Sequence, residues 1–124
     1  MAQISWMFWC EHGFLDEAQR PCLIGIFRHV ILRQVPGIIN RAMLAIAWWG
    51  NPGEQVQAEL QVYDARSVMV ASTPLAPIRI GQMGEGISFV LFDGFQFQVT
   101  GWHRIEVGVP GGPSQPFWFW VGQG

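Results

Sequence analysis

The 124-residue sequence contains no lysine, only two cysteines and few charged residues of either sign. Charged residues make up 13% of the chain and the formal net charge is -2, which argues against a nucleic-acid partner because such proteins carry clustered basic residues. All seven basic residues are arginine, and a biased genome composition explains this more readily than selection for bidentate contacts. Cys10 and Cys22 are too few for a disulfide framework and lack metal-ligand spacing.

Long apolar segments are also absent. The longest candidate run, Ala42 to Trp49, has eight residues, whereas a membrane-spanning helix needs about 20. The N-terminus shows neither the basic nor the apolar region of a signal peptide. We therefore expect no membrane span and a cytoplasmic location. Because half of the residues are hydrophobic and the mean hydropathy is +0.23, much apolar surface has to be buried by folding or by association.

Short apolar segments between glycines and prolines predict strands, and no segment has a long helical period. The clearest alternation of apolar and polar residues runs from Gln55 to Tyr63. The expected strands are 3–11, 22–33, 42–49, 55–63, 68–71, 86–95, 103–109 and 117–121. This pattern predicts one all-β domain over residues 1–124, a β-sandwich of seven or eight strands with immunoglobulin-like or related topology. A small β-barrel is the alternative.

Three local features refine this fold prediction. Asp64 to Ser67 is expected to form a turn, and Gly111-Gly112 between two alternating segments predicts a hairpin. Trp102, at the start of the penultimate strand, is a candidate for the aromatic residue that locks the corner between two sheets of a sandwich.

The strand nearest the N-terminus carries Trp6-x-x-x-Cys10-Glu11, and the next expected strand begins P-C-L-I-G-I-F at Pro21. Near the C-terminus, His103 to Val109 is followed by the closing strand P-F-W-F-W-V, Pro116 to Val121. In these motifs the chain resembles a family of small, uncharacterised bacterial all-β proteins. The resemblance implies a small all-β domain and carries no activity. The chain departs from the family pattern at His12, Cys22 and Arg28, so no polar site of the first loop is carried over.

Recognisable catalytic motifs are missing from the sequence. The glycine-rich run Gly81 to Gly86 is followed by no predicted helix that could hold a phosphate, so it is interpreted as a turn. A zinc site built from His12, His29 or His103 with Cys10 or Glu11 would need strand pairing to assemble it, and polar or buried histidines are the simpler interpretation. Asp16 with Glu17, and Asp64 with Arg66, are interpreted as solvated loop charges. We expect no enzymatic activity, no cofactor and no metal.

The aromatic residues, 14% of the chain, are concentrated in its two end strands. Successive strand residues point to opposite faces, so Phe117, Phe119 and Val121 can complete a core while Trp118 and Trp120 point away from it. Met7 and Trp9 share one face of the first strand. The predicted interface residues are therefore Met7, Trp9, Trp118 and Trp120. If Trp118 and Trp120 were fully exposed, they would present about 300 to 500 Å² of aromatic surface.

Three interpretations of this surface are open. It can bind another copy of the chain or a protein partner, with the tryptophans as anchors. It can be a tryptophan platform for carbohydrate, with Gln96, Gln98, Gln115 and Gln123 as polar neighbours. It can also be covered by a loop of the same chain. The first interpretation is preferred, and it predicts a non-enzymatic binding or assembly module, either a homo-oligomer or an accessory subunit of a bacterial complex.

Overall fold

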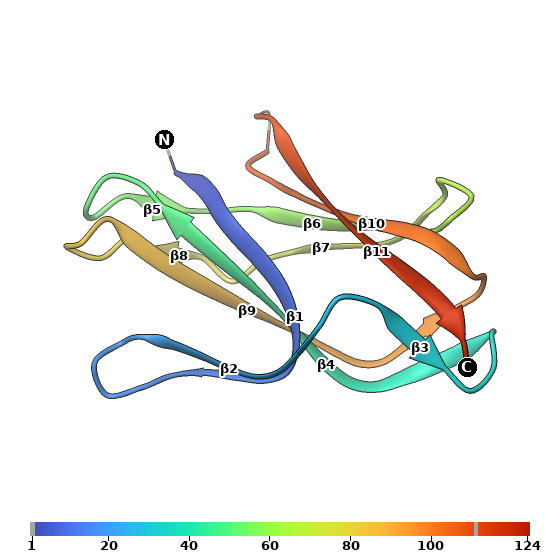
Figure 1. The fold of residues 1–124 in the computed structure, drawn as a ribbon. Helices are drawn as coiled ribbons and strands as arrows, with labels where there is room; N and C mark the ends of the chain where they lie inside the picture. Colours follow the sequence, from blue (N-terminus) through green and yellow to red (C-terminus); the bar gives the residue numbers. More distant parts are fainter. Residues whose placement is uncertain (1, 111) are drawn as a thin grey trace.

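Two β-sheets that face each other dominate the structure, a computed structural model that describes residues 2–110 and 112–124 (Figure 1). One has the strand order β2-β1-β4-β9, the second β3-β11-β10-β6-β7, and β5 and β8 form a small separate pair. The bounds are β1 (Gln3–Leu15), β2 (Pro21–Phe27), β3 (Val30–Leu32), β4 (Gly37–Trp49), β5 (Gln55–Val56), β6 (Glu59–Tyr63), β7 (Met69–Pro74), β8 (Ile78–Arg79), β9 (Glu85–Phe97), β10 (Gly101–Gly108) and β11 (Ser114–Gln123). The all-β sandwich prediction is confirmed. No helix long and apolar enough to cross a membrane occurs among these residues.

Each of the eight predicted strand segments contains a strand, but two of them are divided. The segment 22–33 is split at Arg28 and His29, so that β2 lies in the four-stranded sheet and β3 pairs in parallel with β11 in the other sheet. The segment 55–63 is divided into β5 and β6, and β8 was not predicted. Apolar residues continue on both sides of the bend, and Phe27 before it and Val30 after it both pack in the core, so hydrophobicity alone did not reveal this break.

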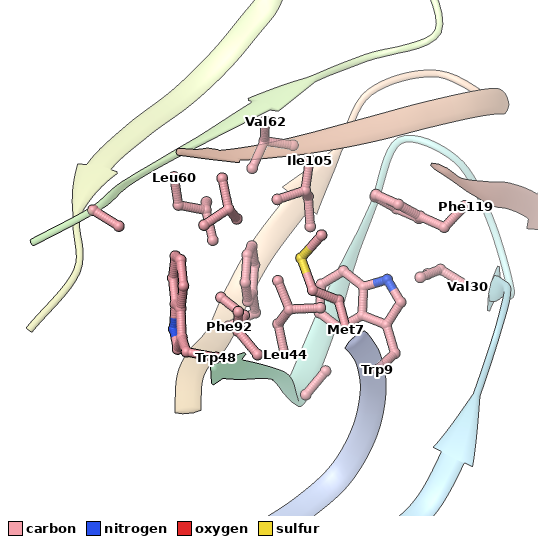
Figure 2. Close-up of a cluster of buried hydrophobic side chains, with 14 of the residues drawn as sticks. Met7, Trp9, Val30, Leu44, Trp48, Leu60, Val62, Phe92, Ile105 and Phe119 are labelled. Carbon is pink, nitrogen blue, oxygen red and sulfur yellow. The ribbon is translucent and has the colours of Figure 1, made fainter. Parts of the chain in front are cut away.

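The core lies between the two sheets and follows the strand period of two. In β11, Phe119 and Val121 are fully buried, and in the neighbouring β10 the same holds for Ile105. From the opposite sheet, Leu44 and Ile46 of β4 point into the same core, which Figure 2 shows in part. The prediction that Phe119 and Val121 complete the core beside β10 is confirmed.

Trp9 is the largest fully buried side chain of the described residues and packs in this core (Figure 2). Its indole stacks on Phe27 with 5.9 Å between ring centroids and meets Phe92 and Phe119 edge-to-face at 4.9 and 5.4 Å. Met7, on the same face of β1, is also buried. The expectation that Met7 and Trp9 lie on an exposed binding surface is therefore wrong. This face of β1 is the one that points toward the second sheet, and the exposed side of the strand carries Phe8 instead.

After its last pairing with β4, the β1 strand bends and its hairpin with β2 runs across the outer face of the four-stranded sheet (Figure 1). Gly13 makes this close approach possible, because a Cβ at this position would lie 2.6 Å from Cε1 of Phe89 in β9. The Gly13 N–H also points to the sulfur of Met43 in β4, at 3.2 Å. The hairpin is thus packed against the sheet rather than projecting into solvent.

The turns follow the predicted chemistry with one correction. Asp64 to Ser67 forms a turn, but Asp64 is buried and its carboxylate accepts hydrogen bonds from the Arg66 side chain and from the N–H groups of Arg66 and Val68. It is a structural residue and not a solvated loop charge. The hairpin pairing of β10 with β11 is confirmed by the register from Gly101↔Val121 to Gly108↔Ser114, while residue 111 of the predicted turn lies outside the described residues.

Trp9 is the largest fully buried side chain of the described residues, so its removal is expected to be costly. We expect Trp9→Ala to lower the free energy of unfolding by about 3 to 5 kcal/mol, because it removes a fully buried aromatic side chain and leaves a cavity. Trp118→Ala, at a site where more than half of the side chain is exposed, should cost clearly less. Urea unfolding monitored by circular dichroism measures both, and equal losses in the two variants would contradict this view of the core.

Candidate functional site

The outer face of the five-stranded sheet carries a cluster of exposed aromatic residues. The β10–β11 register places Trp102 opposite Trp120 and Arg104 opposite Trp118. Because the alternate positions of both strands are used by the core, these side chains point outward. Trp102, Trp118 and Trp120 retain 52%, 55% and 39% of their accessible surface, so no loop of the described chain covers them. Together with Arg104 and Tyr63 of the adjacent β6, they are referred to below as the outer aromatic face.

The rings of the outer aromatic face contact one another edge-on. Trp102 and Trp120 meet with centroids 5.5 Å apart and ring planes at 77°. The His29 ring lies 6.0 Å from Trp102, also edge-to-face. Trp120 lies over Gly122, since a Cβ on that glycine would come within 2.8 Å of the indole Nε1. Such contacts fix the ring orientations, so the face is shaped before any partner binds.

Arg104 links the aromatic rings to a polar rim. Its guanidinium carbon lies 3.9 Å from the centroid of the Tyr63 ring and 5.8 Å from that of Trp118, within cation–π range. The Arg104 Nε approaches Oε2 of Glu106 at 3.4 Å, and Ser114 donates to Oε1 of the same carboxylate. The guanidinium is held between two rings and a carboxylate, so the orientation of Arg104 on this face is fixed.

The structure brings together only two of the four predicted site residues. Trp118 and Trp120 lie on the outer aromatic face, whereas Met7 and Trp9 belong to the core. Trp102, predicted as a corner aromatic between the sheets, is instead half exposed on this face, and that prediction is wrong. The missed residues Trp102 and Arg104 do carry a sequence signal, because they alternate with His103 and Ile105 on the strand beside the closing one.

A second apolar surface lies on the outer side of the four-stranded sheet. Its exposed members are Phe8 of β1, Ile24 and Ile26 of β2, and Leu91 of β9. Part of this side is covered by the β1–β2 hairpin through the Gly13–Phe89 contact. It also carries one exposed indole, Trp49 of β4. It belongs to the other sheet than the outer aromatic face, so Leu91 provides a control position on the same molecule.

The other ionisable residues considered as site candidates are Asp64, Cys10 and the histidines. Burial raises the pKa of Asp64, but the hydrogen bonds from Arg66 and Val68 outweigh it and leave the carboxyl with a lowered pKa. Burial raises the pKa of the Cys10 thiol, which favours its neutral form, and both cysteines are free. No three His, Cys, Asp or Glu side chains of the described residues are placed to share a metal ion, and His103 lies in the core, away from His12 in the other sheet.

His103 is the one histidine buried in the sandwich. Its Nδ1 lies 3.0 Å from the Gly101 carbonyl oxygen, so that nitrogen carries the proton and donates it. The other ring nitrogen, Nε2, is buried without a hydrogen-bond partner among the described residues, beside the rings of Phe97 and Phe119. Burial lowers the pKa of His103 below 6.5, and the Gly101 carbonyl and the Asp64 charge only partly oppose this effect.

Comparisons with known proteins give similarity of fold without similarity of sequence. No family model and no curated protein sequence matches the chain. Among solved structures, the chain is similar to a part of a β-glucosidase from Listeria innocua in its complexes with isofagomine, gluconolactone and glucose, with TM-scores of 0.56, 0.55 and 0.54. The identity is 12% in each case, and the match covers 98% of this chain but 16% of the enzyme chain. At this identity the likeness shows the fold alone.

The environment of His103 predicts a pH-dependent stability. Because the pKa is lowered in the folded state, the unfolded chain takes up the proton first as the pH falls below about 6.5. We expect the free energy of unfolding to be highest above this pH and to decrease toward pH 5, with a slope from this group of at most about 1.4 kcal/mol per pH unit. Urea unfolding at several pH values should show a shallower slope for His103→Phe. An unchanged slope would contradict the assignment.

Proposed function

We propose that this protein is a non-enzymatic binding or assembly module of the cytoplasm that acts through its outer aromatic face, as a homo-oligomer or as an accessory subunit of a bacterial complex. The observation that carries the proposal is the exposure of three clustered indoles, Trp102, Trp118 and Trp120, on a regular sheet surface. Tryptophan, tyrosine and arginine are the residues that dominate binding energy at protein interfaces. The outer aromatic face contains all three types, with charged and hydroxyl groups at its rim.

The energetics favour a partner that covers more than the indoles alone. Three half-exposed tryptophans leave about 300 Å² of aromatic surface in water, and covering it would release about 7 kcal/mol. Association costs about 4 to 15 kcal/mol in lost translational and rotational freedom. The partner therefore has to contact the surroundings as well, and Tyr63, Arg104 and the exposed Ile31 lie within the same sheet face.

A second copy of the chain satisfies these requirements. In a two-fold dimer the same patch meets itself, so it has to contain groups that complement one another. The outer aromatic face has Arg104 and Glu106 side by side along β10, and a two-fold axis between them sets the arginine of one copy against the glutamate of the other. The exposed indoles then lie beside this charged pair, where the sheet of the other copy covers them.

The carbohydrate alternative is less well supported on this face. Sugar rings stack on flat aromatic faces, whereas the planes of Trp102 and Trp120 are at 77° and Trp118 is approached by Arg104. The expected amides are also placed elsewhere. Gln96 and Gln98 are at the end of β9 in the other sheet, and Gln115 and Gln123 alternate with the tryptophans along β11. The Listeria β-glucosidase is a carbohydrate-active enzyme by its description, but the likeness to a small part of it supports the fold only.

The proposal predicts that Trp118→Ser combined with Trp120→Ser converts an assembled protein into a monomer. Removal of two central anchors should weaken self-association by at least about 100-fold, since anchor residues each contribute about 2 kcal/mol or more. Multi-angle light scattering of the purified full chain at micromolar concentrations measures the molar mass. Circular dichroism should show that both substitutions leave the fold intact, because the side chains are exposed.

Leu91→Ser is the matched control for this experiment. Leu91 is 51% exposed, but it lies on the outer side of the four-stranded sheet. We expect this variant to assemble like the unmodified protein. If Leu91→Ser dissociates the protein and the double tryptophan variant does not, the interface lies on the other sheet. A monomer for all three proteins would overturn the homo-oligomer form of the proposal.

A further inference from the structure

A pocket of about 520 Å³ lies between the folded-back β1–β2 hairpin and the outer side of the four-stranded sheet. Its volume falls within the range of about 300 to 1,000 Å³ that is usual for small-molecule sites. The pocket is formed by four separate parts of the chain, namely the start of β1, the hairpin tip, the end of β4 and the β8–β9 connection. It is separate from the outer aromatic face, which belongs to the other sheet.

Two indoles and a small apolar floor line the sheet side of this pocket. Trp6 of β1 pairs with Ala47, and Ala47 pairs with Ile87 of β9, so these three side chains form one row across the sheet. Trp49, two residues after Ala47, points to the same side and keeps 53% of its surface exposed. Leu15 of the hairpin closes the opposite wall. The pocket lining therefore contains two indole side chains with a small residue between them.

Polar groups surround these apolar walls on several sides. The lining includes the Ser5 hydroxyl, the Gln19 amide, the Arg79 guanidinium and the Glu85 carboxylate, each on an exposed residue. Neither Arg79 nor Glu85 forms an ion pair with another described residue. The pocket thus has one positive and one negative group, both with free hydrogen-bonding capacity.

We propose that this pocket binds a neutral saccharide of one or two rings. Arg79 and Glu85 have no net charge together, so an anion or a cation in the pocket gains little net Coulomb attraction and an uncharged molecule loses nothing by comparison. A purely aliphatic ligand would cover Arg79, Glu85 and Gln19 without replacing their hydrogen bonds to water, which costs about 1 to 3 kcal/mol for each group. A sugar ring has an apolar C–H face that stacks on indole and hydroxyl groups that both donate to carboxylate and accept from guanidinium. Its chemistry matches both parts of the lining.

The hairpin tip that carries Gln19 is held in a defined shape. The Asp16 carboxylate accepts hydrogen bonds from the N–H groups of Ala18 and Arg20 and from Nε of Arg20, at 2.8 to 2.9 Å. Gln19 has the left-handed backbone conformation with φ of 62° and donates its N–H to the Asp16 carbonyl. With Gly13 packed on Phe89 at the base of the hairpin, the pocket is formed before a ligand binds, which lowers the cost of binding.

The test is a titration of the ¹⁵N-labelled full chain with cellobiose and with maltose, which differ only in the stereochemistry of the linkage. The readout is the set of indole Nε1–H signals from the seven tryptophans, assigned by single substitutions. We expect the Trp6 and Trp49 signals to shift in a saturable way with at least one sugar, while those of Trp102, Trp118 and Trp120 stay in place. Trp49→Ala should weaken binding about tenfold, through loss of one stacking surface, and Arg79→Met should weaken it several-fold.

Met69→Ser is the matched control, since it removes a similarly exposed apolar side chain from β7 of the other sheet, outside the outer aromatic face, and it should bind the sugar like the unmodified chain. Decanoate is titrated in parallel as an aliphatic carboxylate. No shift with either sugar, a shift confined to the outer aromatic face, or a response to decanoate alone would each overturn the proposal. None of these results bears on the oligomeric state, so the failure of this proposal is distinguishable from failure of the proposed function.

Discussion

The Trp9 indole, the largest fully buried side chain of the described residues, packs between the two sheets and constrains which way the strands around it face. Its ring contacts Phe27 and Phe92 from its own sheet and Phe119 from the other. Because strand side chains alternate strictly, placing Trp9 inside places Phe8 and Trp6 outside, and placing Phe119 inside leaves Trp118 and Trp120 outside. A chain with so many aromatic residues in its end strands cannot bury both faces of either strand in one core. The exposed indoles are the consequence of satisfying this central contact.

The outer surfaces of the two sheets differ in how far the rest of the chain covers them. On the four-stranded sheet, β1 bends after Cys10 and its hairpin returns over the surface, held where Gly13 lets it meet Phe89. Apolar residues there are partly covered and enclose a pocket with polar groups at its edge. On the five-stranded sheet no described segment returns over the tryptophans, and their rings pack against one another and against Arg104 instead. A covered surface suits a small ligand, whereas an open one of this width suits another macromolecule.

Buried polar groups within the sandwich serve the fold. Asp64 closes its turn through four hydrogen bonds to Arg66 and Val68, and the charge of this carboxylate also acts on His103, which packs against Phe97 and Phe119. The imidazole keeps one nitrogen without a partner among the described residues, and this arrangement is stable only while the ring is neutral. The Asp64 carboxylate therefore closes a turn, and the His103 ring packs in the core. The two proposed binding sites therefore lie on the outer sides of the two sheets.

Local residue patterns were enough to predict the all-β class, the approximate position of eight strand segments and the division of β11 into a core side and an exposed side. Period-two patterns are local, and a run of residues such as Phe117 to Val121 contains them completely. Only the tertiary structure decided which face of β1 is buried, since both faces are apolar and the choice depends on where the second sheet lies. It also decided that the segment 22–33 changes sheets at Arg28 and His29, that Trp102 joins Trp120, and that Trp6 and Trp49 share a pocket with Arg79. These contacts join residues far apart in the chain, and pairing between distant strands is set by the packing of the whole core rather than by any one segment.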